Sequence, residues 1–516
     1  MSDPAADIVV IGSGPAGVSA ALPLVEAGRR VVMIDGGRNR DASAGSPWHR
    51  MLGAHLEALR PDDGLSPKLR TPEARRLLGA FHGREPIEAE DFLAIGALGR
   101  GGLSRIWGAF VCELQDDDLQ GWPLTAYDLR QSYDAVVARI GVSGSHDDDM
   151  AAFYGYSDAL QMPPPLGPTA AAIFKRYSAA RPDPEFALGR ARNALITENR
   201  WQRQSCDLRL GCLWGCERGA IYDARQDIAL LRQYANFELR DVTARRLVRA
   251  DGGWDVITTR GDRLHAPRLI VAAGTLGSLR LVAPLLGPAL ELRVLNSPVM
   301  AVPLLVPGRL GGKLPDAGHS LAQLGFRLAC STKPGDYVSG AIYEVAGLPP
   351  SSFAARMPLG RRAATEIFHA LAPALAIATV YFPGRYSANT VTLRPSAQGD
   401  QGDQAPRIEV RGGVAPGFDA VARTARERLA HIWRGLGARP LPGAPLATAG
   451  TDAHLGGLFP MGLAAPHGTN NYGELHAAPG LHLVDGSALP TIPSKFTTLT
   501  IMANADRIGR YLAELA

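Results

Sequence analysis

The chain has 516 residues, which is more than one hydrophobic core usually organises, so we expect two lobes. Apolar residues make up 46% and charged residues 20%, a balance typical of a folded globular protein and not of a disordered one. The net charge of +4 is not gathered into a basic run and no apolar stretch reaches the roughly 20 residues of a membrane span, so we expect neither a nucleic-acid partner nor a transmembrane segment.

The first predicted elements form a complete βαβ unit. An apolar run at 8–11 leads into Gly12-Ser13-Gly14-Pro15-Ala16-Gly17 and an alanine-rich helix, and a second apolar run at 31–34 ends at Asp35. Gly12 allows the tight turn, Gly14 lets the backbone approach a pyrophosphate, and Gly17 allows the helix to pack close to the sheet. The carboxylate of Asp35 can accept both ribose hydroxyls. The unit predicts a dinucleotide site, either FAD or NAD, the alternative being a glycine-rich turn in an unrelated α/β protein.

Three cysteines, Cys206, Cys212 and Cys216, lie close together in the sequence. Their thiolates could ligate zinc or an iron–sulfur cluster, but the C-x5-C-x3-C spacing does not match a common zinc site. We therefore expect free or structural thiols, with a cluster or a disulfide as the alternatives. The chain has five cysteines, an odd number that argues against a disulfide framework and favours a reducing compartment, the cytoplasm.

Short alternating runs at 237–239, 244–248 and 254–258, separated by turn residues, predict a β-meander. It ends in a strand from Leu269 that runs into Gly274 and a helix, which is how a chain returns to a parallel sheet. The nucleotide domain is therefore expected to be discontinuous, and mixed strands and helices beyond it predict an α+β substrate domain built on an antiparallel sheet. We expect parts of the nucleotide-binding domain at 1–125, 195–290 and 447–516, linking and lid segments at 126–194, and the substrate domain at 291–446.

The chain ends with Gly480 to Pro490 and with a final helix from Thr498. The ordered motifs of the chain are Gly12 to Asp35, Gly101-Gly102-Leu103-Ser104, Trp122-Pro123-Leu124, Ala272 to Ser278, His454 to Gly462 and Val484 to Ala503. Through these motifs the chain resembles glucose-methanol-choline (GMC) oxidoreductases over nearly its whole length. The resemblance implies an FAD-binding Rossmann-like α/β fold, a flavin ring between the two lobes and transfer of a hydride from a C–OH carbon to flavin N5.

The resemblance also implies which residues contact the cofactor. In the segment Gly101 to Trp107, Ile106 stands where pyranose oxidases attach FAD to a histidine, so we expect non-covalent FAD. The small residues of this segment allow the backbone to approach the isoalloxazine ring. The expected cofactor-binding residues are Gly12, Gly14, Pro15, Ala16, Gly17, Asp35, Gly36, Gly101, Gly102, Ser104, Trp107, Val242, Ala273, Gly274, Asp485, Gly486 and Thr498.

The catalytic pair that the resemblance implies is only half present. His454 lies in a segment similar to that of the family's catalytic histidine, and a neutral imidazole can take a hydroxyl proton near neutral pH. Phe496 occupies the position of the second member, where it can neither accept a proton nor hydrogen-bond an alcohol. We expect another polar residue to be recruited, with Lys495, Thr497 and Asn470 as the candidates. The family's cluster-binding dehydrogenases have two adjacent cysteines where this chain has Cys206 and Asp207.

We therefore expect an FAD-dependent dehydrogenase or oxidase acting on a small-molecule alcohol. By resemblance to sugar-oxidising members, a sugar, glycoside or cyclitol is the expected substrate. The sequence leaves the electron acceptor open among oxygen, a quinone and a redox protein. Two alternatives remain, a redox-neutral lyase or decarboxylase, which Phe496 favours, and a non-catalytic FAD protein.

Overall fold

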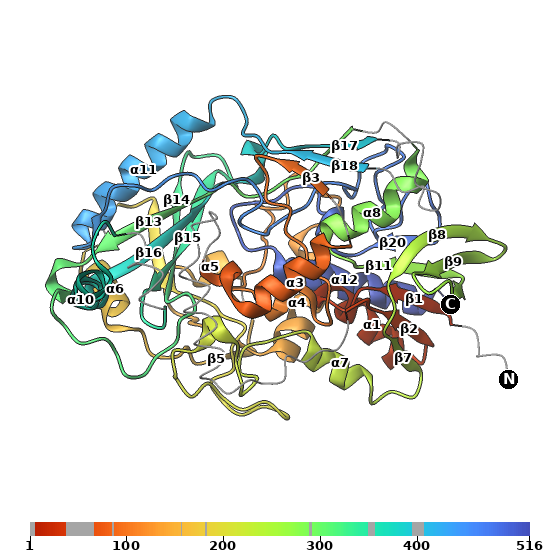
Figure 1. The fold of residues 1–516 in the computed structure, drawn as a ribbon, viewed down its shortest axis with the longest axis horizontal. Coiled ribbons are helices and arrows are strands. Elements are labelled where there is room, and N and C mark those ends of the chain that lie inside the picture. The colour runs from red at the N-terminus through yellow and green to blue at the C-terminus, as the bar shows by residue number, and fades with distance from the viewer. Residues whose placement is uncertain are drawn as a thin grey trace.

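A computed structural model describes residues 6–37, 67–84, 87–155, 157–180, 183–287, 291–348, 357–394 and 407–515. Figure 1 shows two lobes side by side, one built on a parallel sheet and the other on a large antiparallel sheet, and the first and last described elements both lie in the first of these. Within the described ranges, no helix is both long and apolar enough to cross a membrane.

A five-stranded parallel sheet forms the centre of the first lobe, in the order β20-β11-β1-β2-β7. Its strands β1, β2, β11 and β20 are short apolar runs that are buried almost throughout, as expected for a parallel sheet covered on both faces. The strands are β1 (Ile8–Ile11), β2 (Val31–Ile34), β7 (Phe237–Arg240), β11 (Arg268–Val271) and β20 (Leu481–Leu483).

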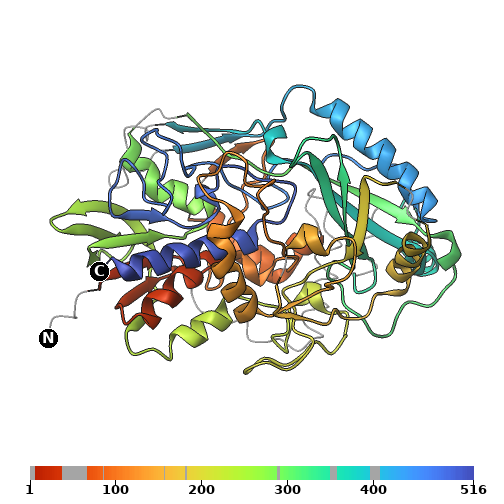
Figure 2. The same cartoon turned by 180° about the vertical axis from the view of Figure 1, so that it is seen from behind.

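Helices cover one face of this sheet, and a small antiparallel sheet packs on β1 and β11 from the other side. Figure 2 shows the last helix lying along the first, and the two are in extensive contact. The helices of this lobe are α1 (Pro15–Glu26), α3 (Pro72–His82), α4 (Ala126–Ile140), α7 (Arg225–Leu231), α8 (Thr275–Leu286) and α12 (Thr498–Glu514). The small sheet, in the order β10-β9-β8, consists of β8 (Ala244–Ala250), β9 (Gly253–Thr258) and β10 (Arg263–Ala266).

The predicted meander is therefore partly wrong. Its first run became β7, which pairs with β2 in parallel and forms an edge of the main sheet. A run of four half-buried residues fits either sheet, and only the pairing of Phe237 with Val31 decides between them. The return to the parallel sheet through β11, α8 and the C-terminal β20 is as expected.

The second lobe contains a six-stranded antiparallel sheet in the order β19-β13-β16-β15-β14-β6. Its strands are β6 (Phe186–Arg190), β13 (Val299–Leu305), β14 (Leu324–Ala329), β15 (Tyr337–Glu344), β16 (Leu375–Tyr381) and β19 (Arg439–Pro440). Strand β6 comes from the segment that we expected to link the lobes. Helices α6 (Pro168–Ala179) and α11 (Phe418–Gly435) share a hydrophobic core with this sheet, and α10 (Arg361–Leu371) packs near the ends of β15 and β16 (Figure 1).

The two faces of this sheet have different environments, because successive side chains of a strand point to opposite sides. In β13, Met300, Val302 and Leu304 pack in the core with α11, whereas Val299 and Ala301 line a cavity. Strand β16 repeats the alternation. One face of the sheet thus stabilises the lobe, and the other forms a wall of the cavity between the lobes.

A third sheet spans the upper side of the molecule in Figure 1, in the order β12-β17-β18-β3. It joins strands from distant parts of the chain, since β3 pairs in parallel with β18. The strands are β3 (Ile87–Glu90), β12 (Glu291–Arg293), β17 (Thr390–Arg394) and β18 (Arg407–Arg411). The remaining short elements are β4 (Val142–Ser143), β5 (Leu160–Gln161) and α5 (Ala151–Tyr154).

Candidate active site

One cavity of about 2060 Å³ extends from the carboxyl ends of β1 and β2 to the open face of the antiparallel sheet. In an open α/β sheet, ligands bind outside the carboxyl ends of the strands. Most of the residues expected to bind the cofactor line this cavity: Gly12, Gly14, Pro15, Ala16, Asp35, Gly36, Gly102, Ser104, Trp107, Val242, Ala273, Gly274, Asp485, Gly486 and Thr498. Gly17 and Gly101 lie behind its wall, where they shape the backbone.

The three glycines of the first turn have different surroundings. Gly12 has φ +104°, and a Cβ there would lie 2.3 Å from the carbonyl oxygen of Ala272. A Cβ on Gly17 would lie 2.0 Å from the carbonyl oxygen of Gly12, so this glycine packs mainly against the turn. Nothing lies within 4 Å of the Cβ position of Gly14, which faces the cavity at the N-terminus of α1. This open cradle of backbone fits a pyrophosphate, which a helix N-terminus favours.

Asp35 holds the turn as well as facing the cavity. Its Oδ2 accepts hydrogen bonds from the backbone N–H and the hydroxyl of Ser13, at 3.1 and 2.6 Å, and its Oδ1 accepts one from the N–H of Gly37 at 2.8 Å. A carboxylate offers about four acceptor positions. One position therefore remains for a ribose hydroxyl, whereas the expectation that Asp35 binds both hydroxyls does not fit these contacts.

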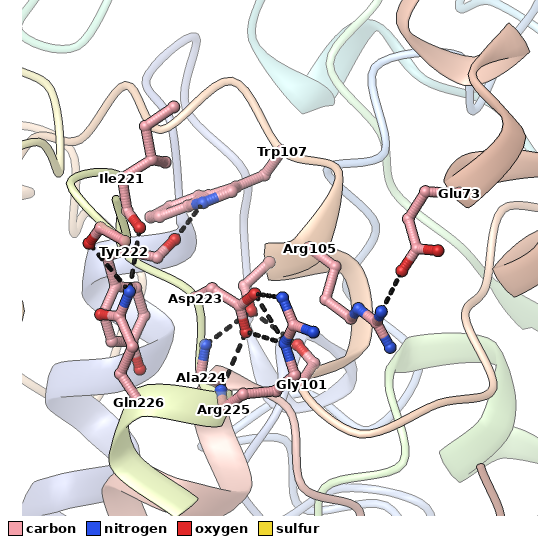
Figure 3. A network of polar contacts seen from close by, with 12 residues as sticks. Glu73, Gly101, Arg105, Trp107, Ile221, Tyr222, Asp223, Ala224, Arg225 and Gln226 are labelled. Carbon is pink, nitrogen blue, oxygen red and sulfur yellow. Dashed lines mark hydrogen bonds and ion pairs between the residues drawn. The ribbon is translucent and has the colours of Figure 1, made fainter. Parts of the chain in front are cut away.

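Two polar side chains of the segment 101–107 are already bonded within the protein. The Ser104 hydroxyl donates to the carbonyl oxygen of Gly101 at 2.6 Å and accepts from the N–H of Ala224 at 3.0 Å. Trp107 Nε1 donates to the carbonyl oxygen of Tyr222 at 2.9 Å (Figure 3). These contacts tie the segment to the loop before α7, so Ser104 and Trp107 shape the cavity and use their polar atoms elsewhere.

Figure 3 also shows a charged network that the sequence did not indicate. Asp223 accepts hydrogen bonds from the guanidinium and the backbone N–H of Arg225, and Arg105 pairs with Glu73 of α3. Gly101 has φ +86°, and a Cβ there would lie 3.0 Å from Asp223 Oδ1, so any larger residue would be strained beside this network. Burial lowers the pKa of Arg105 from its usual value, with Arg225 as a further cause, and Glu73 partly opposes this shift.

Asp485 of the C-terminal motif is a buried acid that lines the cavity. Asp485 Oδ2 accepts from the Ser278 hydroxyl of α8 at 2.5 Å, and its Oδ1 accepts from the N–H and the hydroxyl of Ser487. Burial raises the pKa of Asp485 above its usual value. The acid therefore joins α8 to the final segment and keeps Gly486 and the start of α12 at the cavity wall.

His454 lies in the cavity wall on a strained turn. Ala453 before it has φ +59°, a left-handed conformation that costs an alanine about 1–2 kcal/mol. Asp452 accepts hydrogen bonds from the Ser297 N–H at 2.9 Å and from Asn296 Nδ2 at 3.1 Å, and these contacts hold the turn. Asp452 Oδ2 lies 3.7 Å from His454 Nδ1, which is an ion-pair distance but is too long for a hydrogen bond.

Burial and the nearby cation of Lys68 lower the pKa of His454 to about 4. Burial raises the pKa of Asp452 to about 7. The imidazole is therefore neutral at pH 7, the form in which it can accept a proton.

Phe496 completes a cluster of aromatic rings around His454. Its ring centroid lies 4.4 Å from that of Phe110, 5.0 Å from that of Tyr381 and 5.5 Å from that of His454. All four residues line the cavity. The histidine therefore faces a wall of rings, with no second imidazole or amide in the place of Phe496.

Of the three polar residues considered as replacements, only Thr497 lines the cavity. Lys495 is directed into the protein, where its Nζ lies 2.6 Å from Asp118 Oδ2. Asn470 bonds Glu474 in its own loop, with Nδ2 3.1 Å from Oε2, and is not among the described residues that line the cavity. The expectation for Lys495 and Asn470 is thus corrected: adjacency in sequence did not reveal which way each side chain points.

Cys212 and Cys216 line the cavity and Cys206 lies behind it, and all three are free thiols. In the part of the chain that the structure describes, no group of three His, Cys, Asp or Glu side chains is arranged to hold a metal. Cys212 Sγ accepts a hydrogen bond from the Ser320 N–H at 3.4 Å, and burial raises the pKa of this thiol to about 11.

Sequence reasoning also missed Asp452, Lys68, Tyr343 and Tyr381. Asp452, two residues before His454, gave a local signal, an acid close to the expected base. The other three come from separate segments and meet only in the folded cavity.

Two family models match parts of the chain. Residues 385–505 match the model of GMC oxidoreductase, and residues 6–57 match that of pyridine nucleotide-disulphide oxidoreductase. No curated protein matches the sequence. Among solved structures, pyridoxine 4-oxidase from Mesorbium loti is similar, with a TM-score of 0.59 over 98% of this chain and 99% of that one, at 16% identity. This likeness shows a shared fold over the whole chain.

Proposed function

Since the chain belongs to the GMC oxidoreductase family, whose members use FAD, we propose that it oxidises the CH–OH group of a small alcohol with His454 as the base. The single observation that carries this proposal is the position of His454. It lies in a buried wall of the same cavity that begins at the phosphate turn, and its imidazole is neutral at pH 7.

The residues around the cavity fit FAD. The open backbone at Gly14 and the N-terminus of α1 suit the pyrophosphate, and Asp35 has an acceptor position for the ribose. When bound, FAD supplies a hydride acceptor. Ile106 lines the cavity where a tethering histidine would stand, which supports non-covalent binding.

The protein's own part in the reaction is to position the alcohol and take its proton. His454 accepts the hydroxyl proton, and the turn of Ala453 and Asp452 keeps its ring in place. The aromatic rings exclude water from the reacting carbon, and the Thr497 hydroxyl is the polar group beside Phe496 that can contact substrate. Oxygen, a quinone or a redox protein then removes the electrons. We place the enzyme in the cytoplasm because of its free thiols.

The test is anaerobic reduction of the bound flavin by a panel of alcohols, followed as bleaching of the yellow absorbance. We expect reduction by the wild type and a loss of 10²-fold or more in His454→Ala, the range for removal of a general base, with FAD content unchanged. His476, which is exposed and does not line the cavity, provides the control variant His476→Ala. Equal rates in His454→Ala and the wild type would contradict the assignment.

The contact of Phe496 with His454 favours a second candidate, a redox-neutral flavoprotein such as a lyase or decarboxylase. Turnover of a substrate without bleaching of the flavin would support it against the first. A protein that binds FAD but neither bleaches nor turns over any substrate would instead be a non-catalytic member.

A further inference from the structure

The cavity contains a lysine that the proposed reaction does not use. Lys68 lies in the short 3-10 helix Pro67–Arg70, directly before α3, and its side chain lines the cavity. A methyl group placed on Gly108 would lie 3.7 Å from Lys68 Nζ and 3.9 Å from Tyr343 Oη. The amine and the phenol of Tyr343 therefore reach the same small volume in front of Gly108.

This volume lies beside the base. The cation of Lys68 contributes to the lowered pKa of His454, so the two side chains are close enough to interact. Tyr343 and Tyr381 stand on the cavity face of the antiparallel sheet and also interact with one another. The tyrosine rings thus connect the amine to the aromatic rings around His454.

Lys68 has no counter-ion among the described residues. No hydrogen bond or ion pair of its Nζ is found within the described ranges, and burial alone lowers the pKa of the amine to about 7. The buried lysine at position 495, by contrast, is paired with Asp118. Lys68 is partly buried, and an amine held in the cavity wall without a partner costs free energy unless a ligand supplies the missing charge.

The part of the sheet wall near the base is poor in polar groups. The sheet contributes Val299, Ala301 and Ile377, and the Thr379 hydroxyl already donates to the carbonyl oxygen of Ala341 at 3.3 Å. A polyol would bury several hydroxyls here without partners, each at a cost of about 1–3 kcal/mol. A flat ring would instead pack against Phe110, Tyr381 and Phe496.

We propose that Lys68 anchors the substrate and that the site takes an aromatic alcohol carrying one anionic group, a phenolate or a carboxylate, in preference to a neutral polyol. The ring lies among the aromatic side chains, the anion accepts hydrogen bonds from Lys68 Nζ and Tyr343 Oη, and the CH–OH group reaches His454. The inference rests on the proposed alcohol oxidation and replaces the sugar-type substrate that resemblance alone suggested.

The test compares Lys68→Met with Lys68→Arg in the FAD-bound protein, with the exposed Lys333→Met as the matched control. Anaerobic flavin reduction is measured with 4-(hydroxymethyl)benzoate, benzyl alcohol and glucose. The wild type is expected to prefer the benzoate. Lys68→Met should weaken the binding of the benzoate by about tenfold to a hundredfold, the range for a hydrogen bond to a charged group, and change the binding of benzyl alcohol much less. Lys68→Arg and Lys333→Met should retain most of the preference.

A second measurement does not depend on turnover. Titration with 4-methylbenzoate or 4-methylbenzamide, followed by the change in flavin absorbance, gives the affinity for an anion and for its neutral analogue. Lys68→Met should lose affinity for the anion only. If it lost affinity for both equally, or lost its FAD, or if the wild type preferred glucose, the anchor would be refuted.

The two proposals can fail separately. If no alcohol bleached the flavin but anion binding still depended on Lys68, the alcohol oxidation would be wrong and the anion site would stand. If alcohols bleached the flavin and Lys68→Met bound the benzoate as tightly as the wild type does, the alcohol oxidation would stand and the anion site would be wrong.

Discussion

Replacing Lys495 with Met tests whether this residue serves catalysis or the fold. The side chains of Lys495 and Asp118 are each only 2% exposed, with Nζ 2.6 Å from Oδ2. Lys495 Nζ also donates to the carbonyl oxygen of Glu113, and Asp118 accepts further hydrogen bonds from the Tyr337 hydroxyl and the Gln115 N–H. The variant removes the cation and leaves the carboxylate buried with neutral donors only.

Removing one partner of a buried ion pair typically costs about 3–5 kcal/mol, because the other charge is left uncompensated. We expect the free energy of unfolding of Lys495→Met to fall by this amount. In the double variant Lys495→Met/Asp118→Asn no charge remains unpaired, so the loss should be smaller than the sum of the two single losses.

Urea unfolding followed by circular dichroism measures these losses, with Lys333→Met as the control. The rate of flavin reduction, measured at a temperature where the variant is folded, should stay within a few fold of the wild type. The reasoning would be refuted if Lys495→Met unfolded at the wild-type urea concentration while flavin reduction was abolished, because the lysine would then act on the substrate.

Two further predictions concern the base and the phosphate turn. Because the pKa of His454 is lowered to about 4, its imidazole stays neutral as the pH falls below 6.5. The rate of flavin reduction by a neutral alcohol should therefore stay nearly constant from pH 7 to 5 and decline only towards pH 4. A rate that is halved near pH 6.5 in stopped-flow measurements would argue against this. Gly12→Ala would place a Cβ 2.3 Å from a carbonyl oxygen at a residue with φ +104°, so it should destabilise the protein by about 1–3 kcal/mol or more. Gly14→Ala should change the stability by no more than about 0.5 kcal/mol but reduce the FAD content. Thermal unfolding and absorbance of the purified proteins measure both, and equal FAD content in Gly14→Ala and the wild type would count against a ligand at that turn.

The parts of the fold that the sequence predicted are those with a local cause. The turn at Gly12, Gly14 and Gly17 and the strands on either side of it form because glycine spacing and apolar runs act within a few residues. The meander was misassigned at Phe237 because the choice between two sheets depends on a partner strand about two hundred residues away, a contact that composition does not encode.

The site residues also divide into those with a local signal in the sequence and those that depend on distant segments. His454 was found because its motif is contiguous, and Asp35 because it closes a contiguous unit. The direction of the Lys495 side chain depends on Asp118 and Tyr337, which come from other segments. Lys68 is invisible in sequence because its importance lies in what surrounds it, namely apolar walls and aromatic rings from four different parts of the chain.

The closure of the first lobe by β20 and α12 has a consequence for the order of folding. Strand β20 pairs with β11, α12 packs along α1, and the Arg29 guanidinium donates to the carbonyl oxygen of Ala513 at 2.7 Å. The first lobe therefore depends on segments from both ends of the described chain. The parallel sheet and its helix layer are therefore complete only once β20 and α12 have docked on segments that lie far earlier in the chain, and contacts between such distant segments form slowly during folding.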